Sequence, residues 1–122
     1  MIKLLLCFNQ FSREATAGAV DPVYSEIVKD GLLSIGSNVC ITQGATLLTG
    51  SHNYKKSSFD LLTRGITLED GAWIGAGAIV NLGVTARSHA VLTAGSVATR
   101  DLEAYGIYQG NPAVRIRERI IA

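Results

Sequence analysis

The sequence predicts an all-β fold, a parallel β-helix that a single chain winds from six-residue units, here called hexads. Residues 68–97 divide into five hexads whose first residue is aliphatic and whose fifth is small or Val, and residues 35–52 divide into three more. Ile, Leu or Val leads seven of these eight hexads, and Ala leads one. These three residue types make up 33 of the 122 residues. Chance would place them at only about two of the eight lead positions, so this fixed short period indicates a solenoid.

A hexad can form one short strand and a turn, so three hexads complete a triangular coil and successive coils pair through parallel strands. The aliphatic lead residue then points inward and meets its equivalents in the coils above and below. Eight hexads give fewer than three coils, which leaves little depth for a core, so we expect the chain to form oligomers. The period does not determine the handedness of the coil. Six hexads have Gly at the fourth position, which suits tight turns that need positive φ: Gly44, Gly50, Gly71, Gly77, Gly83 and Gly95.

The N-terminal segment, residues 1–34, contains no clean hexads. Its residues 13–19 include helix formers, residues 23–28 suit either a strand or a short helix, and Asp21-Pro22 and Asp30-Gly31 are turn signals. We therefore assign a divergent N-terminal segment, and the sequence leaves open whether it adds coils to the solenoid.

The β-helix is assigned to residues 35–97 and is interrupted once. Leu47 and Leu68 are 21 residues apart, which is not a multiple of six, so part of the chain between them must leave the solenoid. We assign this excursion to residues 53–65.

The C-terminal tail comprises residues 98–122. Its sequence Gly110-Asn111-Pro112 is a turn signal that would fold the tail back onto the solenoid. Asn111 followed by Pro112 would also suit the start of a helix.

Composition excludes several classes of function. The chain is 48% hydrophobic and 17% charged, which is typical of one globular domain. A formal net charge of +1 favours neither nucleic acid nor an anionic membrane surface as a partner. No stretch approaches the ~18 consecutive apolar residues of a membrane span. Cys7 and Cys40 do not make a disulfide framework, and residues 1–8 lack a signal-peptide cleavage pattern, so we expect a cytoplasmic protein.

Four segments resemble the hexapeptide-repeat family of left-handed β-helix acyltransferases. They are Thr49-Gly-Ser-His-Asn-Tyr54, Leu68-Glu-Asp-Gly-Ala-Trp-Ile-Gly-Ala76, Ala94-Gly-Ser-Val-Ala-Thr-Arg-Asp101 and Tyr108-Gln-Gly-Asn-Pro-Ala113. Within the family the sequence is most similar to the colanic-acid-type exopolysaccharide O-acetyltransferases. It is similar, more distantly, to the maltose, galactoside and antibiotic acetyltransferases. The resemblance covers residues 35–117. It implies a left-handed coil, a homotrimer, acetyl-CoA as donor, no metal, and active sites between neighbouring subunits.

The sequence departs from the family pattern in two places. Family members usually have more hexads before the position of Ile35, and these help to bind the acceptor. Ala86-Arg87 stands where Ile-Gly is usual, and Leu82 stands where Pro is common. The smaller Ala86 removes apolar volume from one core position, but neither change falls in a motif tied to chemistry.

His52 is the candidate catalytic residue. Transfer of acetyl from a thioester to a hydroxyl needs a base that takes the hydroxyl proton, and a neutral imidazole suits this task near neutral pH. By resemblance, His52 matches the family's catalytic His; the alternative is a surface His at a loop entrance. His89 takes the fourth position of its hexad, where an exposed corner His is expected. Two histidines are too few for the related zinc carbonic anhydrases, which need three, and no metal site is predicted.

By the same resemblance, two groups of residues would bind coenzyme A. Small residues along a channel would let the pantetheine arm run close to the backbone, beside the one Trp of the chain. A Thr-Arg pair would contact the nucleotide end, where guanidinium can bind phosphate. The alternatives are hexad packing for the small residues and ordinary solvated charges for the cations, including Arg115 and Arg117. The predicted cofactor-binding residues are Trp73, Gly75, Ala76, Ala94, Gly95, Thr99 and Arg100.

The resemblance implies an acetyl-CoA-dependent O-acetyltransferase that modifies a hydroxyl of a saccharide or small molecule, as in polysaccharide biosynthesis. Transfer would be direct, with His52 as base and backbone N–H groups near Gly75-Ala76 around the oxyanion. In the excursion, Tyr54 and Phe59 could stack on a sugar or anchor the loop. Two alternatives stay open: a non-catalytic β-helical scaffold of the same family, and a transferase for an antibiotic hydroxyl or an amino sugar.

Overall fold

The computed structural model describes residues 2–7 and 32–122, with side chains for the second range. Every regular element in these ranges is a strand, which confirms the all-β prediction. The helix, strand and turns expected between residues 13 and 31 lie outside the described residues.

The strands are β1 (Ile2–Cys7), β2 (Leu33–Ile35), β3 (Cys40–Leu47), β4 (Gly50–His52), β5 (Leu61–Thr63), β6 (Ile66–Leu68), β7 (Trp73–Ile74), β8 (Ile79–Val80), β9 (Thr85–Ala86), β10 (Val91–Leu92), β11 (Val97–Ala98), β12 (Gly106–Gly110) and β13 (Ala113–Glu118).

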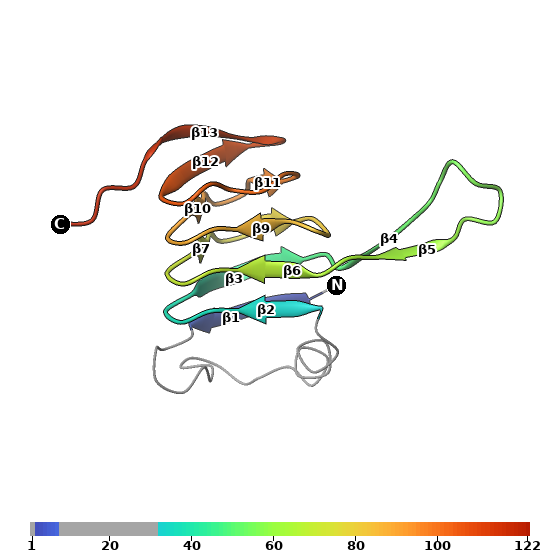
Figure 1. The fold of residues 1–122 in the computed structure, drawn as a ribbon, viewed down its shortest axis with the longest axis horizontal. Coiled ribbons are helices and arrows are strands. Elements are labelled where there is room, and N and C mark those ends of the chain that lie inside the picture. The colour runs from blue at the N-terminus through green and yellow to red at the C-terminus, as the bar shows by residue number, and fades with distance from the viewer. Residues whose placement is uncertain (1, 8–31) are drawn as a thin grey trace.

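The strands stack in coils, as Figure 1 shows, with parallel pairing along three faces. The first face consists of β2, β6 and β9. The second consists of the start of β3 with β7, β10 and β12. The third consists of the end of β3 with β8 and β11, because β3 bends at Gly44 and serves two faces. The predicted parallel β-helix is therefore confirmed.

The register follows the hexads. Leu68 pairs with Ala86, Ile74 with Leu92 and Val80 with Ala98, so equivalent positions in successive coils are eighteen residues, or three hexads, apart. The lead residues from Ile41 onward are at most 1% exposed, and Ile35 packs against the same core. Truncating such a buried aliphatic residue to Ala typically costs about 2–5 kcal/mol.

The fourth hexad position forms the turns. Five of the six glycines expected at positive φ have it, with values from 65° to 78°, and Asn38 and His89 take the same conformation at 58° and 59°. Gly50 is the exception, because it lies in the strand β4 rather than at a corner.

Antiparallel strands border the solenoid at both ends. β1 pairs with β3, from Ile2 opposite Leu47 to Cys7 opposite Cys40. At the other end β13 pairs with β12 through the turn at Gly110-Asn111-Pro112, so the predicted reversal is confirmed and the alternative of a helix after Asn111 is wrong. Strands added in this way occupy backbone groups that would otherwise form an open edge. In the described ranges, no helix is long and apolar enough to span a membrane.

The excursion forms an arm that projects from the solenoid (Figure 1). Its two strands, β4 and β5, pair antiparallel, with His52 opposite Leu61. We call residues 50–63 the arm. At its base the Arg64 N–H donates to the Thr49 carbonyl oxygen at 3.0 Å. The arm therefore leaves the solenoid at the corner between the third and first faces.

Candidate active site

His52 is the last residue of β4 and is exposed on the arm. Its Nδ1 lies 3.0 Å from the carbonyl oxygen of Phe59. A carbonyl oxygen only accepts hydrogen bonds, so this contact requires a proton on Nδ1, and in the neutral ring the lone pair is then on Nε2. In the neutral ring, Nε2 is thus the nitrogen able to accept a proton.

The tip of the arm holds Phe59 where it can make this contact. The Asn53 N–H donates to the Asp60 carbonyl at 2.8 Å, and two turns follow, from Asn53 to Lys56 and from Lys56 to Phe59. The Lys56 ammonium also approaches the Asp60 carboxylate at 3.4 Å, an exposed pair that adds at most about 1 kcal/mol. The backbone bonds, more than the ion pair, define the tip.

Phe59 covers one face of the His52 ring. The two rings stack with centroids 4.3 Å apart and an interplanar angle of 6°. The backbone of Phe59 has a φ of 51°, in the left-handed region, which costs about 1–2 kcal/mol for a residue with a side chain. Of the two roles predicted for Phe59, the stack favours the anchor within the arm. No periodicity in the sequence could have shown this pair, because it depends on the conformation of the tip.

Trp73 lies on the outside of β7 and is 46% exposed. Its indole Nε1–H donates to the Thr42 hydroxyl at 2.9 Å. It is in register with Cys40 on one side and Val91 on the other, on the second face of the solenoid. One edge of the indole is therefore fixed, and much of its surface stays accessible.

Position 75 requires Gly because the next coil leaves no space for a side chain. A Cβ at Gly75 would lie 2.6 Å from the backbone nitrogen of Ala94 and 2.8 Å from the carbonyl oxygen of Leu92. The Gly75 N–H already donates to that Leu92 oxygen at 2.8 Å. Of the backbone N–H groups expected near Gly75-Ala76 for an oxyanion, the Gly75 N–H is therefore already used by the stacking of coils. Packing thus accounts for Gly75.

Ala76, Ala94 and Gly95 are exposed at the corner between the second and third faces. The Gly95 N–H donates to the Ala76 carbonyl at 2.9 Å, which stacks these turns directly on one another. A Cβ at Gly95 or Gly77 would meet nothing within 4 Å. The corner thus presents a smooth column of small residues to its surroundings.

Thr99 and Arg100 are exposed at a different corner. They follow β11 and precede Leu102, which bridges to Ala86 on the first face. This is the corner from which the arm leaves, two coils higher. Within one chain, therefore, His52 and Thr99-Arg100 share a corner, whereas the small-residue column lies beyond the third face. Arg115 and Arg117 lie exposed on β13, with the end-capping hairpin.

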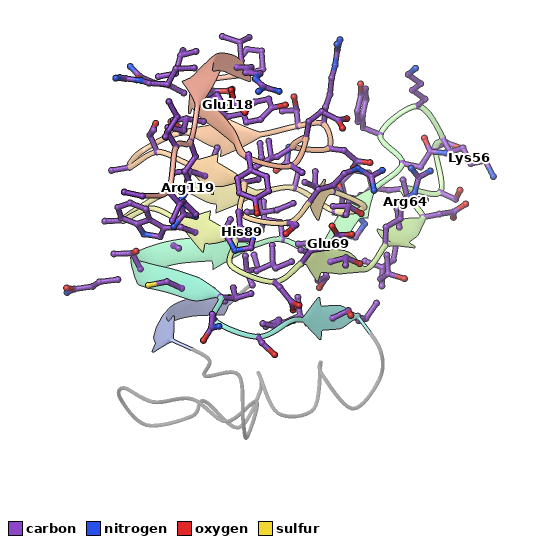
Figure 2. The ribbon with its side chains drawn as sticks, turned by 60° about the vertical axis from the view of Figure 1, so that its left-hand side comes forward. Lys56, Arg64, Glu69, His89, Glu118 and Arg119 are labelled. Carbon is purple, nitrogen blue, oxygen red and sulfur yellow. The ribbon has the colours of Figure 1, made fainter. Side chains whose placement is uncertain are left out.

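His89 lies at the third corner, away from the arm (Figure 2). It is half-buried rather than exposed as expected, because its ring stacks on Tyr105 with centroids 4.8 Å apart. Its Nδ1 lies 2.7 Å from the Ser88 hydroxyl. The Arg119 Nη1 donates to the carbonyl oxygens of Gly71, at 2.9 Å, and His89, at 3.2 Å. These contacts give His89 a structural role, and the contribution of Arg119 was not predicted.

A cavity of about 320 Å³ opens beside this corner, lined among others by Glu69, Asp70 and Ser88. Its carboxylates serve the fold: Asp70 Oδ1 accepts from the Ser37 N–H at 2.7 Å, and Glu69 Oε1 accepts from the Ser88 N–H at 2.9 Å. None of the predicted catalytic or cofactor residues lines it. Across residues 32–122 no group of three or more His, Cys, Asp or Glu could hold a metal ion.

Comparison with known proteins identifies relatives of the chain. No family model matches the sequence. The chain is 34% identical over 90 residues to the putative colanic acid biosynthesis acetyltransferase WcaF of Escherichia coli, a match that covers 74% of this chain and 50% of WcaF. It is 35% identical over 95 residues to the galactoside O-acetyltransferase of E. coli, covering 75% of this chain and 47% of the relative. The chain thus spans about half the length of the curated relatives it matches.

The fold has solved counterparts. The structure of a hexapeptide-repeat acetyltransferase, VCA0836 from Vibrio cholerae, complexed with acetyl-CoA matches 74% of this chain and 55% of its own, with a TM-score of 0.60 and 25% identity. The hexad register, the stacked parallel coils and these sequence matches agree. The chain belongs to the hexapeptide-repeat family of β-helical acyltransferases and is similar to its colanic-acid-type O-acetyltransferases.

Proposed function

We propose that this chain is an acetyl-CoA-dependent O-acetyltransferase that modifies a hydroxyl of a saccharide or other small molecule. The observation that carries the proposal is the contact between His52 Nδ1 and the Phe59 carbonyl oxygen, because in the neutral imidazole it puts the lone pair on Nε2, on an exposed arm. A base in this state is what hydroxyl acetylation needs. The similarity to relatives named as acetyltransferases supports the same chemistry.

The proposed reaction is direct transfer. Nε2 of His52 takes the proton of the acceptor hydroxyl while the hydroxyl oxygen attacks the thioester carbonyl carbon. The carbon–sulfur bond then breaks, and the imidazolium returns the proton to the leaving sulfur. The products are the acetyl ester and coenzyme A, and no Ser or Cys nucleophile takes part. Because the Gly75 N–H is already bonded within the solenoid, the oxyanion must be stabilised by other donors.

We place the pantetheine arm of coenzyme A along the small-residue corner of Ala76, Ala94 and Gly95, with Trp73 beside it and Gly75 shaping the turn. The geometry that supports this is the absence of obstruction at Gly77 and Gly95 within 4 Å. Thr99 and Arg100 are proposed to contact the phosphates, since a guanidinium binds phosphate with two parallel hydrogen bonds.

A homotrimer would complete this site. His52 and the small-residue corner of one chain lie on different corners, so a neighbouring copy would have to bring its own His52 to the column. The shallow solenoid, with 46% of Trp73 exposed, also favours assembly. Because acetyl-CoA is a cytosolic metabolite, the proposed reaction belongs in the cytoplasm.

The test compares donor binding and turnover. Coenzyme A at 100 times its Kd should raise the stability of the folded state by about 2.7 kcal/mol, which a thermal-shift titration detects. Release of the coenzyme A thiol is then followed with a panel of saccharide, amino-sugar and antibiotic acceptors. His52→Ala should lower kcat by roughly 10²- to 10⁴-fold and leave coenzyme A binding intact, whereas Lys55→Ala at the same tip should not.

Each rival reading has its own outcome. No stabilisation at millimolar acetyl-CoA would support the non-catalytic scaffold. Turnover restricted to amines or to an antibiotic hydroxyl would support the other alternative. Loss of donor binding or of assembly in His52→Ala would remove the assignment of this residue as the base.

A further inference from the structure

We infer that Phe59 is a positioning residue for His52, acting through its ring as well as its carbonyl. The ring fixes the plane of the imidazole, and the carbonyl fixes which nitrogen carries the proton. The kinetic part of this inference rests on the proposed function, but the geometry of the pair does not.

The backbone of Phe59 carries the first part of the argument. A bulky residue at a φ of 51° is an outlier, since this region suits Gly or Asn. Glycines take this conformation at five corners of the solenoid, and of the other residues that share it besides Asn38, His89 and Tyr105 form a stacked pair of rings of their own. A side chain retained at a strained position near a candidate site indicates that the side chain itself has a use.

The ring carries the second part. Phe59 is 55% exposed, so burial in a core does not account for it. Its ring instead lies nearly parallel to the imidazole, with centroids 4.3 Å apart, slightly closer than is usual for a stacked aromatic pair. Without this contact, His52 on an exposed arm would be free to change rotamer and tautomer. The stack and the 3.0 Å hydrogen bond restrain the imidazole together, and its Nε2 then points in one direction.

Covering one face of the imidazole also limits how an acceptor can approach. Phe59 uses a face of its ring on His52, and the carbonyl occupies Nδ1. The acceptor hydroxyl must therefore approach in the region of Nε2. Tyr54, 80% exposed at the same tip, is the aromatic of the arm left to contact a saccharide.

Variants at position 59 separate the ring from the backbone. Phe59→Gly and Phe59→Asn keep the carbonyl, relieve the left-handed strain and remove the ring. Phe59→Tyr keeps a ring. If Phe59 only stabilised the fold, the loss of its ring would lower thermal stability and activity together. If it positions His52, the Gly and Asn variants keep their melting temperature, lose roughly 10- to 100-fold in kcat and keep the KM for acetyl-CoA, and Phe59→Tyr restores kcat.

A readout independent of activity is the NMR spectrum of the imidazole rings. The chain has two histidines, so His89 serves as an internal reference. The wild-type protein should show His52 protonated on Nδ1 when neutral, with its ring protons shifted upfield by the Phe59 ring. The upfield shift should vanish in Phe59→Gly and persist in Phe59→Tyr and in the tip control Tyr54→Ala.

The positioning role of Phe59 and the proposed acetyltransferase function can be refuted by different results. A neutral His52 protonated mainly on Nε2, or the absence of the upfield shift in the wild-type protein, would overturn the positioning role even if the protein acetylates acceptors. The expected spectrum in a protein that transfers no acetyl group would leave the pair intact and remove the proposed function. Kinetics of Phe59→Gly equal to those of the wild type would also overturn the inference.

Discussion

Gly75 and Ala94 lie so close across two stacked coils that a Cβ on Gly75 would be 2.6 Å from the Ala94 backbone nitrogen. The neighbouring Gly77 differs in both respects: its φ is 65°, and a Cβ there would meet nothing within 4 Å. The two glycines of one turn are therefore required for different reasons, one steric and one conformational.

Replacing each glycine by Ala should separate these reasons. Gly75→Ala forces two coils apart and should lower the free energy of unfolding by at least about 3 kcal/mol, at the upper end for overpacking. Gly77→Ala should lower it by only about 1 kcal/mol, the strain of Ala in the left-handed region. Urea denaturation measures both. Equal costs would show that the coils at this turn can move apart freely.

Trp73 provides a direct report on coenzyme A, because it is the only Trp of the chain and is 46% exposed. If the cofactor runs along the neighbouring corner, titration with coenzyme A should change the tryptophan emission with the same midpoint as the thermal-shift titration. Trp73→Phe should weaken coenzyme A binding and lose the hydrogen bond to Thr42, at a cost of about 1 kcal/mol in stability. Unchanged emission at saturating coenzyme A would move the cofactor away from the second face.

The sequence predicts the solenoid well because the residue types within each hexad indicate which positions are buried. Lead residues such as Ile41 and Val80 are fully buried, and their spacing alone shows which side of the chain faces inward. The end strands β1 and β13 carry no such signal, since each pairs once and antiparallel, without a repeat to average over. The six-residue period therefore predicts the stacked coils but not the strands that border them.

The sequence likewise predicts some features of the candidate site and not others. His52 was found from its motif, but its partner Phe59 depends on two turns at the tip of the arm, which no spacing rule describes. Of the N–H groups expected near Gly75-Ala76 for the oxyanion, that of Gly75 is used by the pairing of coils, which the sequence does predict. The hexad pattern predicts an exposed corner residue at His89, because the packing of His89 against Tyr105 comes from the irregular segment after β11.

Arg119 should stabilise the C-terminal end of the solenoid. Its Nη1 reaches the carbonyl oxygens of Gly71 and His89, and its own N–H donates to the Tyr105 carbonyl. Arg119→Ala keeps the backbone bond and leaves two carbonyls without this donor, so the free energy of unfolding should fall by about 1–3 kcal/mol. Amide hydrogen exchange in β12 and β13 should quicken, while exchange in β7 and β8 changes less. Arg117→Ala, on exposed β13, is the matched control, and an equal effect there would point to net charge instead.

The arm offers the sharpest separation of folding from function. Its residues from Ser51 to Leu62 are exposed or half-buried, and at the base Arg64 bonds to Thr49. Replacing residues 51–62 by a short Gly-containing turn should therefore leave the solenoid folded, with a melting temperature close to that of the wild type. It removes His52, so turnover should be lost while coenzyme A still stabilises the protein.

The same truncation tests how the subunits assemble. If the arm only presents His52, the truncated chain should elute as the same oligomer as the wild type, measured by light scattering after size exclusion. If the exposed Leu61 and Leu62, at 66% and 40%, dock on a neighbouring copy, the oligomer should dissociate and stabilisation by coenzyme A should weaken with it. The arm would then bind subunits together as well as carry the base.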